Sequence, residues 1–307
     1  MGKKKSAPAV LWTLFLATLA GIFLYVLAVE ANFLFLFGSS PGLDKLENPI
    51  SDQASEIYTS DGVLLGRYFK ENRSPVGFDK ISPVLLDALV ATEDIRFYEH
   101  SGIDLKAIGS VFVAAGKGEK RGGSTLSQQL AKNLYKTRTE GSKGILGYIP
   151  GLSTVIAKTK EWITAVKLEQ GYTKNEILTM YLNTVDFGSN SFGIKTAAKT
   201  FFNTSPDSLK TEEAALLVGL LKATSAYSPV LNPERSLERR NVVLAQMAKY
   251  NKLSEKEADS LSKLPIKLTY NVENHYEGPA TYFRGTMNGY LKEWCEKNGY
   301  DLYRDGL

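Results

Sequence analysis

The first 30 residues restrict the fold more than any other part of this 307-residue chain. Lys3, Lys4 and Lys5 precede an uncharged stretch from Ser6 to Val29 that is densely apolar from Val10. About 20 apolar residues suffice for a helix to cross a bilayer, and flanking lysines stay on the cytoplasmic side. A cleaved signal peptide is the alternative, but its apolar region spans only about 7–15 residues. The sequence therefore predicts a cytoplasmic tail at 1–9 and an uncleaved transmembrane anchor at 10–31, with the rest of the chain outside.

The composition argues against several classes of function. A net charge of +4 is too small for a strong nucleic-acid footprint, so we expect no nucleic-acid partner. The single cysteine, Cys295, excludes an internal disulfide and a cysteine metal cage. Only two histidines are present, which argues against a histidine-based zinc site.

The organisation after the anchor indicates a mainly α fold. A connector at 32–55 leads to a segment at 56–69 that is typical of a hairpin, with Asp61 and Gly62 at its turn. From there to Tyr250, helix signals dominate; one is the capping box formed by Thr173 and Glu176, and Ser254 with Glu257 forms another just beyond. We therefore expect a helical domain at 56–250, with a small β element leading into it.

The segment 91–102 (ATEDIRFYEHSG) ends a predicted helix on two carboxylates. Glu93 is the candidate general base, and the like charge of Asp94 beside it would make it a better proton acceptor. The alternative is an ordinary solvated helix end.

The segment 122–133 (GGSTLSQQLAKN) is a glycine turn that opens a helix. Ser124, Gln128 and Lys132 stand at i, i+4 and i+8, so we expect them on one helix face. A hydroxyl, an amide and a cation suit a sugar phosphate, and a helix N-terminus favours anions. An exposed polar stripe without a ligand is the alternative.

The segment 158–161 (KTKE) places two lysines before Glu161. Such a cluster can hold a pyrophosphate, directly or through a divalent ion on the carboxylate. The alternative is the charged side of an amphipathic helix.

The stretch 141–154 (GSKGILGYIPGLST) is rich in glycine and in large apolar residues. It is too short to span a membrane. Apolar side chains exposed together favour contact with lipid, and a plain surface loop is the alternative.

These segments resemble, in order, the first three motifs of the family 51 glycosyltransferases, the peptidoglycan polymerase domains of class A penicillin-binding proteins. The later stretches 172–183, 192–198, 213–223 and 232–244 are similar to the rest of the series, so the resemblance covers about 56–250. One departure is Ala157, where the family often has arginine.

The resemblance implies a lysozyme-like helical domain on the outer, periplasmic face of the bacterial inner membrane. Such a domain polymerises lipid II in β-1,4 linkage with inversion and releases undecaprenyl pyrophosphate. It implies Glu93 as the base and Glu161 as a second carboxylate at the donor pyrophosphate or its Mg or Mn ion. The implied partners are lipid II, the growing glycan strand, the membrane and cell-wall synthesis proteins.

The resemblance also assigns further positions. Those implied to contact substrate are Ser124, Thr125, Gln128, Gln129, Lys132, Asn133, Lys158 and Lys160. Those implied to be motif or structural positions are Asp94, Phe97, His100, Gly102, Gly123 and Asn183.

The tail at 251–307 resembles a linker toward a transpeptidase domain that the chain lacks. Ser260 and Lys263 fit a Ser-x-x-Lys nucleophile motif, but no Lys-Thr-Gly follows, so we expect no transpeptidase activity. A lytic transglycosylase and a non-catalytic membrane scaffold are the alternative functions. The lysines of the second and third motifs argue against the first, and Glu93 with Glu161 argues against the second.

Overall fold

The computed structural model describes residues 7–40, 54–69, 73–119, 122–135, 143–272 and 280–307. Most of the predicted cytoplasmic tail and connector, and the first two residues of the apolar loop, lie outside these residues.

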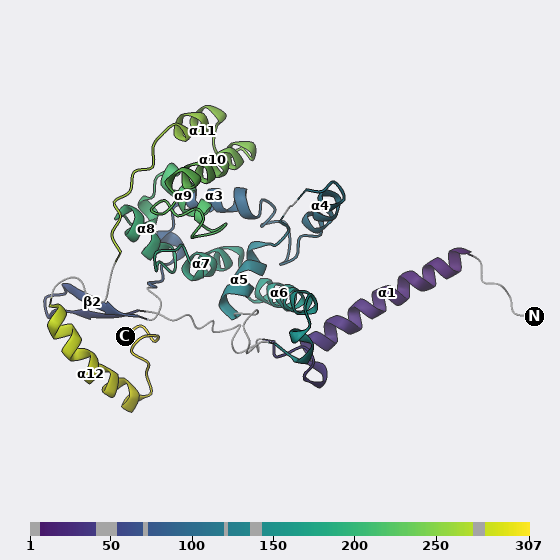
Figure 1. Ribbon diagram of the computed structural model, residues 1–307, viewed down its shortest axis with the longest axis horizontal. Coiled ribbons are helices and arrows are strands. Elements are labelled where there is room, and N and C mark those ends of the chain that lie inside the picture. The colour runs from purple at the N-terminus through teal and green to yellow at the C-terminus, as the bar shows by residue number, and fades with distance from the viewer. Residues whose placement is uncertain (1–6, 41–53, 70–72, 120–121, 136–142, 273–279) are drawn as a thin grey trace, which may run out of the picture.

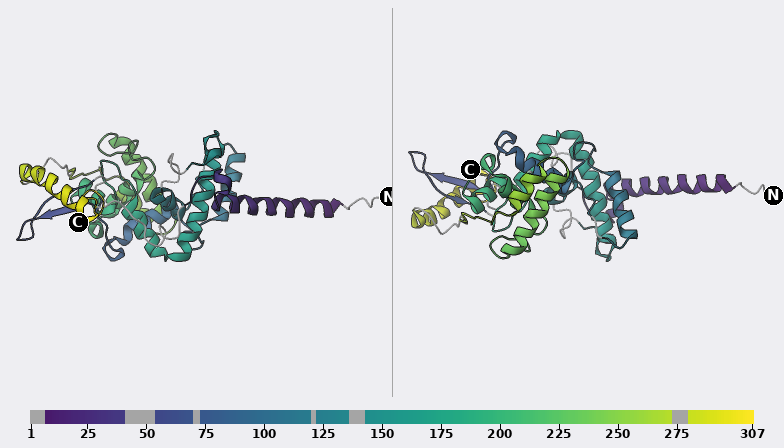
Figure 2. Two further views of the ribbon diagram at one scale, coloured as in Figure 1. Left: turned by 90° about the horizontal axis from the view of Figure 1, so that it is seen from below. Right: turned by 90° about the horizontal axis from the view of Figure 1, so that it is seen from above.

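Helix α1 (Ala7–Glu30) projects from one end of the molecule, opposite the end that carries β2 and α12 (Figures 1 and 2). Its span Pro8–Glu30 is long and apolar enough to cross a membrane. The outer end of α1 is docked on α6 (Leu152–Gly171). There Val29 is buried against Ile156, and Tyr25 lies 3.2 Å from the Thr159 hydroxyl. This apolar helix is therefore fixed to the folded body.

The predicted hairpin is present as β1 (Ser55–Tyr58) and β2 (Leu64–Tyr68). The strands are antiparallel, with Glu56 opposite Arg67, and Gly62 in the turn has a φ of +83°. A positive φ is the conformation that glycine adopts without steric cost, which explains the Asp-Gly signal.

The body of the molecule is helical. Its remaining α-helices, apart from the C-terminal one, are α3 (Pro83–Glu93), α4 (Leu105–Gly116), α5 (Leu126–Tyr135), α7 (Lys174–Thr184), α8 (Ile194–Phe202), α9 (Thr211–Leu220), α10 (Pro233–Lys249) and α11 (Glu255–Ser262). Both capping boxes expected from sequence form, at the starts of α7 and α11. The expected mainly α fold with a small β element is confirmed.

Helix α9 is the central element of the core. Its residues 214–220 are all buried, because α3 and α10 pack on it. A helix that is apolar on every side can only be stable when surrounded in this way. The packing holds the end of α3 in place, and that end carries the first motif.

The residues at 251–307, predicted as a linker, include two packed helices. Arg240 is fully buried and donates to the carbonyls of Leu261, Ser262 and Leu264, which ties α11 to α10. Helix α12 (Thr281–Asn298) and the residues after it cover the hairpin, where Cys295 and Leu302 pack on Tyr68. The domain boundary at 250 stays a prediction.

Candidate active site

Helix α3 ends at Glu93 because Asp94 leaves the helical conformation, with φ −159° and ψ 77°. The two neighbouring carboxylates then have different surroundings. Asp94 is buried, and its Oδ2 lies 3.0 Å from His100 Nε2 and accepts a bond from the Leu126 amide at 3.0 Å. Asp94 therefore joins the first motif to the start of α5. Both residues line a cleft, but Glu93 is the less buried of the two.

His100 acts as a bridge between Asp94 and the turn that follows. Its Nδ1 accepts a bond from the Gly102 amide at 3.2 Å. A ring nitrogen that accepts carries no proton, so we assign the neutral imidazole with its proton on Nε2, directed at Asp94. Both ring nitrogens are thus used inside the protein, which fits the predicted structural role of His100.

Gly102 lies directly against helix α6. Its φ is +90°, and a Cβ atom there would approach the Ala165 carbonyl carbon to 2.8 Å. Its own carbonyl accepts bonds from Thr125 Oγ1 at 2.7 Å and Gln128 Nε2 at 3.1 Å. Only a residue without a side chain fits between these two segments.

The second motif differs from the face expected by spacing. Helix α5 begins only at Leu126, so Ser124 precedes it and shares no helix face with the other two residues. Gln128 points inward and is 1 % exposed, whereas Lys132 is exposed to solvent. The expected one-sided face is wrong, because the residues at 122–125 lie outside the helix. Thr125 and Gln128 here hold the Gly102 turn.

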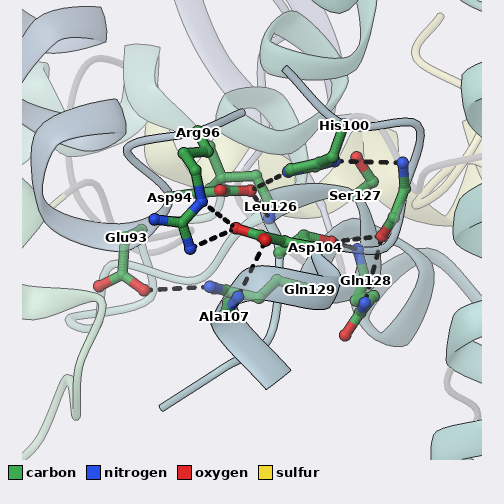
Figure 3. A network of polar contacts seen from close by, with 12 residues as sticks. Glu93, Asp94, Arg96, His100, Asp104, Ala107, Leu126, Ser127, Gln128 and Gln129 are labelled. Atoms are coloured by element: carbon green, nitrogen blue, oxygen red, sulfur yellow. Dashed lines mark hydrogen bonds and ion pairs between the residues drawn. The ribbon is translucent and has the colours of Figure 1, made fainter. Parts of the chain in front are cut away.

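Gln129 holds the carboxylate of Glu93. Its Nε2 donates to Glu93 Oε2 at 3.0 Å, and its Oε1 accepts from the hydroxyl of Tyr181 at 3.0 Å (Figure 3 shows the contact with Glu93). Tyr181 is buried on α7, and burial, aided by the negative charge of Glu93, raises its pKa well above the usual value. It therefore remains a neutral donor that fixes the Gln129 amide.

We expect Tyr181→Phe to lower the turnover of an enzyme that uses Glu93 by about 2- to 10-fold, since one hydrogen bond contributes about 0.5–1.5 kcal/mol. KM should not change, because the phenol does not line the cleft. Steady-state kinetics check this, with Tyr98→Phe, an exposed hydroxyl, as the control. If Tyr181→Phe keeps the wild-type turnover, the Gln129 amide does not depend on the hydroxyl of Tyr181.

The cleft that contains Glu93 has a volume of about 540 Å³. Further lining comes from the turn after α9, through Lys222, and from α10, through Arg239, Gln246 and Lys249. Arg239 lies 4.0 Å from Glu93 Oε1. Sequence reasoning missed these residues as site residues. Arg239 stood in a stretch matched to the family, but its spacing indicated no role.

Arg96 and Asp104 form a second unpredicted contact of the cleft wall. Arg96 donates to Asp104 Oδ2 at 2.8 Å, and Asp104 caps α4 by accepting from the Ala107 amide at 2.9 Å. Burial opposes ionisation of Asp104, but the Ala107 amide and Arg96 outweigh it and lower the pKa of the carboxyl. The pair fixes α4 beside the glycines of the second motif.

The third motif meets the second through Ser124. Lys158 Nζ donates to Ser124 Oγ at 2.7 Å and to Glu161 Oε2 at 2.9 Å. Glu161 is 1 % exposed, so this carboxylate is enclosed by α6 and its surroundings. Ser124 also lines the Glu93 cleft, which brings the lysine–carboxylate pair next to it.

Lys160 is almost fully buried, which is rare for a lysine. Its Nζ donates to the Ser39 carbonyl at 3.1 Å. Burial lowers its pKa from 10.5 to about 8. The group therefore changes charge near neutral pH.

The remaining predicted positions lie around this centre. Asn133 is half-buried on α5, and Gly123 packs where a Cβ would approach Val111 to 2.7 Å. Phe97 is fully buried in the core. The side-chain amide of Asn183 exchanges two bonds with the Val76 backbone, which ties the end of α7 to the chain before α3.

A divalent cation would need ligands beyond those of the protein. In the part of the chain that the structure describes, no three His, Cys, Asp or Glu side chains gather at one point. Glu161 is a buried carboxylate that is joined to Ser124 of the second motif through Lys158, and Lys158 already pairs with it. The protein side chains alone thus do not fit a complete cation site.

The fold and this site together define a helical domain built around a cleft with one accessible glutamate and adjoining cations. A family model described as transglycosylase matches residues 61–248, and the chain belongs to that family.

Penicillin-binding protein 1A of Haemophilus influenzae is 39 % identical over 81 % of this chain and 28 % of its own length. Penicillin-binding protein 1F of Bacillus subtilis is 37 % identical over 82 % of this chain and 34 % of its own. Penicillin-binding protein 1A of Escherichia coli is 34 % identical over 81 % and 28 %. The chain thus spans about a third or less of these relatives.

A crystal structure of the Haemophilus influenzae protein aligns with 83 % of this chain and 26 % of its own, at 25 % identity and a TM-score of 0.45. The predicted relationship to the transglycosylase domain of penicillin-binding proteins is confirmed by the family model.

Proposed function

We propose that this chain is a peptidoglycan glycosyltransferase that polymerises lipid II into β-1,4-linked glycan strands, with inversion and release of undecaprenyl pyrophosphate. The observation that carries the proposal is the position of Glu93. Its carboxylate lines the cleft and is oriented by Gln129. The carboxylate of the neighbouring Asp94 is instead bound by His100 and the Leu126 amide. A carboxylate in a cleft that Arg239 lines, with Lys158 bonded to the cleft residue Ser124, suits a displacement in which pyrophosphate leaves.

In the proposed reaction Glu93 accepts the proton of the acceptor 4-hydroxyl as that oxygen attacks the anomeric carbon of the donor. The bond from this carbon to the pyrophosphate oxygen breaks, and the electron pair leaves with the pyrophosphate. A single displacement inverts the anomeric centre. Lys158, Lys160 and Lys132 are the proposed cations for the leaving charge.

Glu161 has two proposed roles at the donor. It fixes Lys158 at 2.9 Å, and together with the pyrophosphate oxygens it would hold an Mg or Mn ion. Magnesium is commonly bound through one or two carboxylates plus substrate phosphates. Ser124, Thr125, Gln128, Gln129 and Asn133 are proposed as substrate contacts or as the residues that position them.

The proposed location is the outer face of a bacterial inner membrane, with α1 as a single span. The lysines before α1 would stay cytoplasmic. Cell-wall synthesis proteins are the proposed protein partners.

Polymerisation of purified lipid II by the full chain in detergent tests the function. We expect glycan strands that a phosphoglycolipid mimic of the donor suppresses. Cleavage of purified cell wall without polymerisation would instead indicate a lytic transglycosylase. Inactivity of a correctly folded chain on both substrates would indicate a scaffold.

Lys160 provides a pH test. Because its pKa is about 8, the ammonium is lost as pH rises through 8, and polymerisation that needs this charge should fall there. Stability should move the other way: the unfolded lysine binds its proton up to about pH 10, so the free energy of unfolding rises between pH 8 and 10.

The pH dependence of turnover in wild type and in Lys160→Arg checks this, because arginine keeps its charge throughout. The decline near pH 8 should disappear in the variant. A decline that is identical in both proteins would assign it to another group.

The apolar loop gives a third test. Ile145, Tyr148 and Ile149 are 64 %, 67 % and 49 % exposed, whereas Leu146 and Leu152 pack against the end of α1. The Leu146 amide also donates to the Leu36 carbonyl at 2.9 Å, which sets the loop beside the anchor. We propose that the three exposed side chains enter the bilayer.

We expect Ile145→Asp/Ile149→Asp to weaken liposome binding at least about tenfold, because burying each such side chain contributes about 1.5–3 kcal/mol. The chain is shortened only by residues 1–24, so that Val29 keeps its packing. Val63→Asp/Leu231→Asp, both exposed elsewhere, is the control. Equal sedimentation of the two variants would make this segment a solvent loop.

A further inference from the structure

A second cleft, of about 530 Å³, lies between β2, the chain at 74–80, α8 and the turn at 203–207. It shares no lining residue with the Glu93 cleft. Figures 1 and 2 show β2 and α8 toward the end of the molecule away from α1. The cleft therefore lies away from the proposed membrane surface.

The walls of this cleft carry an excess of positive charge. Arg67, Lys80, Lys195 and Lys199 line it, against the single lining carboxylate of Asp207, an excess of three charges. Asp207 already accepts bonds from the hydroxyls of Ser205 and Ser208.

The four cations differ in how they are paired. Arg67 donates to Glu56 at 2.7 Å, and Lys80 lies 3.8 Å from Asp79. By contrast, Lys195 and Lys199 form no ion pair within the described part of the chain, and the bond of Lys199 to Asn203 Oδ1 is to a neutral amide. These two charges are available to a ligand.

The placement of Lys195 is unfavourable for α8 itself. It stands in the first turn of the helix, where the macrodipole disfavours a cation. It also stands four residues before Lys199, and like charges at that spacing repel. Glu56 compensates Lys195 only in part, because it attracts Lys195 at longer range while Arg67 and Tyr58 bind its oxygens directly. A position that breaks two local rules in this way is a candidate functional position.

The remaining lining suits a small polar ligand. Thr196 and Thr200 contribute hydroxyls from buried positions, while Leu64, Val76 and Pro206 add apolar surface. The volume falls within the usual range for ligand pockets. The two lysines are one helical turn apart, with about 5–6 Å between their Cβ atoms, a spacing that suits two neighbouring anionic groups of one ligand.

We propose that this cleft binds an anionic ligand that carries at least two carboxylate or phosphate groups. Lys195 and Lys199 hold the two groups from α8, Arg67 and Lys80 face them, and the threonine hydroxyls donate to their oxygens. The site is independent of the proposed glycosyl transfer, because no residue is common to the two clefts.

Isothermal titration of the full chain in detergent at low salt tests the site, with citrate and tricarballylate as probes, because pyrophosphate is already the proposed leaving group at the Glu93 cleft. We expect both to bind, and Lys195→Gln/Lys199→Gln to weaken binding at least tenfold. The matched control is Lys256→Gln/Lys292→Gln, which removes the same charge from exposed positions on α11 and α12 and should change binding less than twofold.

The single variant Lys195→Gln provides a second readout. Because the lysine is unfavourable in α8, its loss should raise the melting temperature slightly while binding weakens. Glycosyl transfer should stay at the wild-type level in both lysine variants, which separates this proposal from the proposed function.

Three results would overturn the proposal. One is the absence of binding of either probe to the wild type at millimolar concentration. Another is equal weakening by the double variant and its control, which would reduce the effect to overall charge. The third combines two observations: the soluble probes do not bind, and the chain binds anionic vesicles in a way that depends on Lys195 and Lys199. That result would assign the two lysines to a lipid surface.

Discussion

Glu93→Gln is expected to reduce polymerisation of lipid II by about 10²–10⁴-fold, the usual loss when a positioned general base is removed. The amide keeps the size of the side chain, so the cleft should keep its shape, but it cannot accept the proton of the sugar hydroxyl. Turnover of purified lipid II measures the loss, and the thermal melting curve of the variant checks that the fold is intact.

Glu99→Gln is the matched control, since Glu99 is an exposed carboxylate in the same motif and does not line the cleft. It should retain wild-type activity within about twofold, as surface changes away from a site usually do. Retention of more than about a tenth of the wild-type turnover by Glu93→Gln, above that range, would show that another group takes the proton. Asp104, which also lines the cleft, would then be the next carboxylate to test.

Gly102→Ala should cause the largest loss of stability. Its positive φ costs a residue with a side chain about 1–2 kcal/mol, and overpacking against a rigid neighbour adds about 1–3 kcal/mol. The neighbour is the backbone of α6 at Ala165 and Val166, which cannot rotate away as a side chain could. We expect the free energy of unfolding to fall by about 2–5 kcal/mol and the melting temperature by about 5–15 °C.

Gly118→Ala separates the two causes. Gly118 has a φ of +75° but nothing within 4 Å of the added Cβ atom, so it reports the backbone strain alone. Chemical denaturation of both variants measures the difference. If the two substitutions cost the same, the close approach to α6 contributes nothing. Activity should also fall in Gly102→Ala, because the Gly102 carbonyl receives the bonds of Thr125 and Gln128.

Neighbouring residues show where sequence reasoning reached its limit. Gln128 and Gln129 are adjacent and chemically identical, and both stood in the second motif. One is buried under the Gly102 turn, and the other holds Glu93. Helix α5 packs against both α6 and α7. Which side of α5 remains open to the cleft therefore depends on helices more than 20 residues away in the chain.

Asp94 shows the same limit of sequence reasoning for a charged residue. In the sequence it stands beside Glu93 with the same charge, and the resemblance implies only a motif or structural position for it. In the structure His100 and the Leu126 amide both contact Asp94 Oδ2. Leu126 lies 32 residues later in the sequence, so only the folded chain brings its amide to this carboxylate.

The sequence alone determined the apolar anchor, the hairpin turn, the two capping boxes and the end of α3 at Glu93. Those features follow from hydropathy, from the glycine at a positive φ and from side chains that bond their own helix end, all within a few residues. Tertiary structure alone decided the lining of the cleft at Arg239, the burial of Lys160 and the cation-lined cleft beside α8. Each of these depends on which distant segment packs nearby, and local patterns carry no information about that packing.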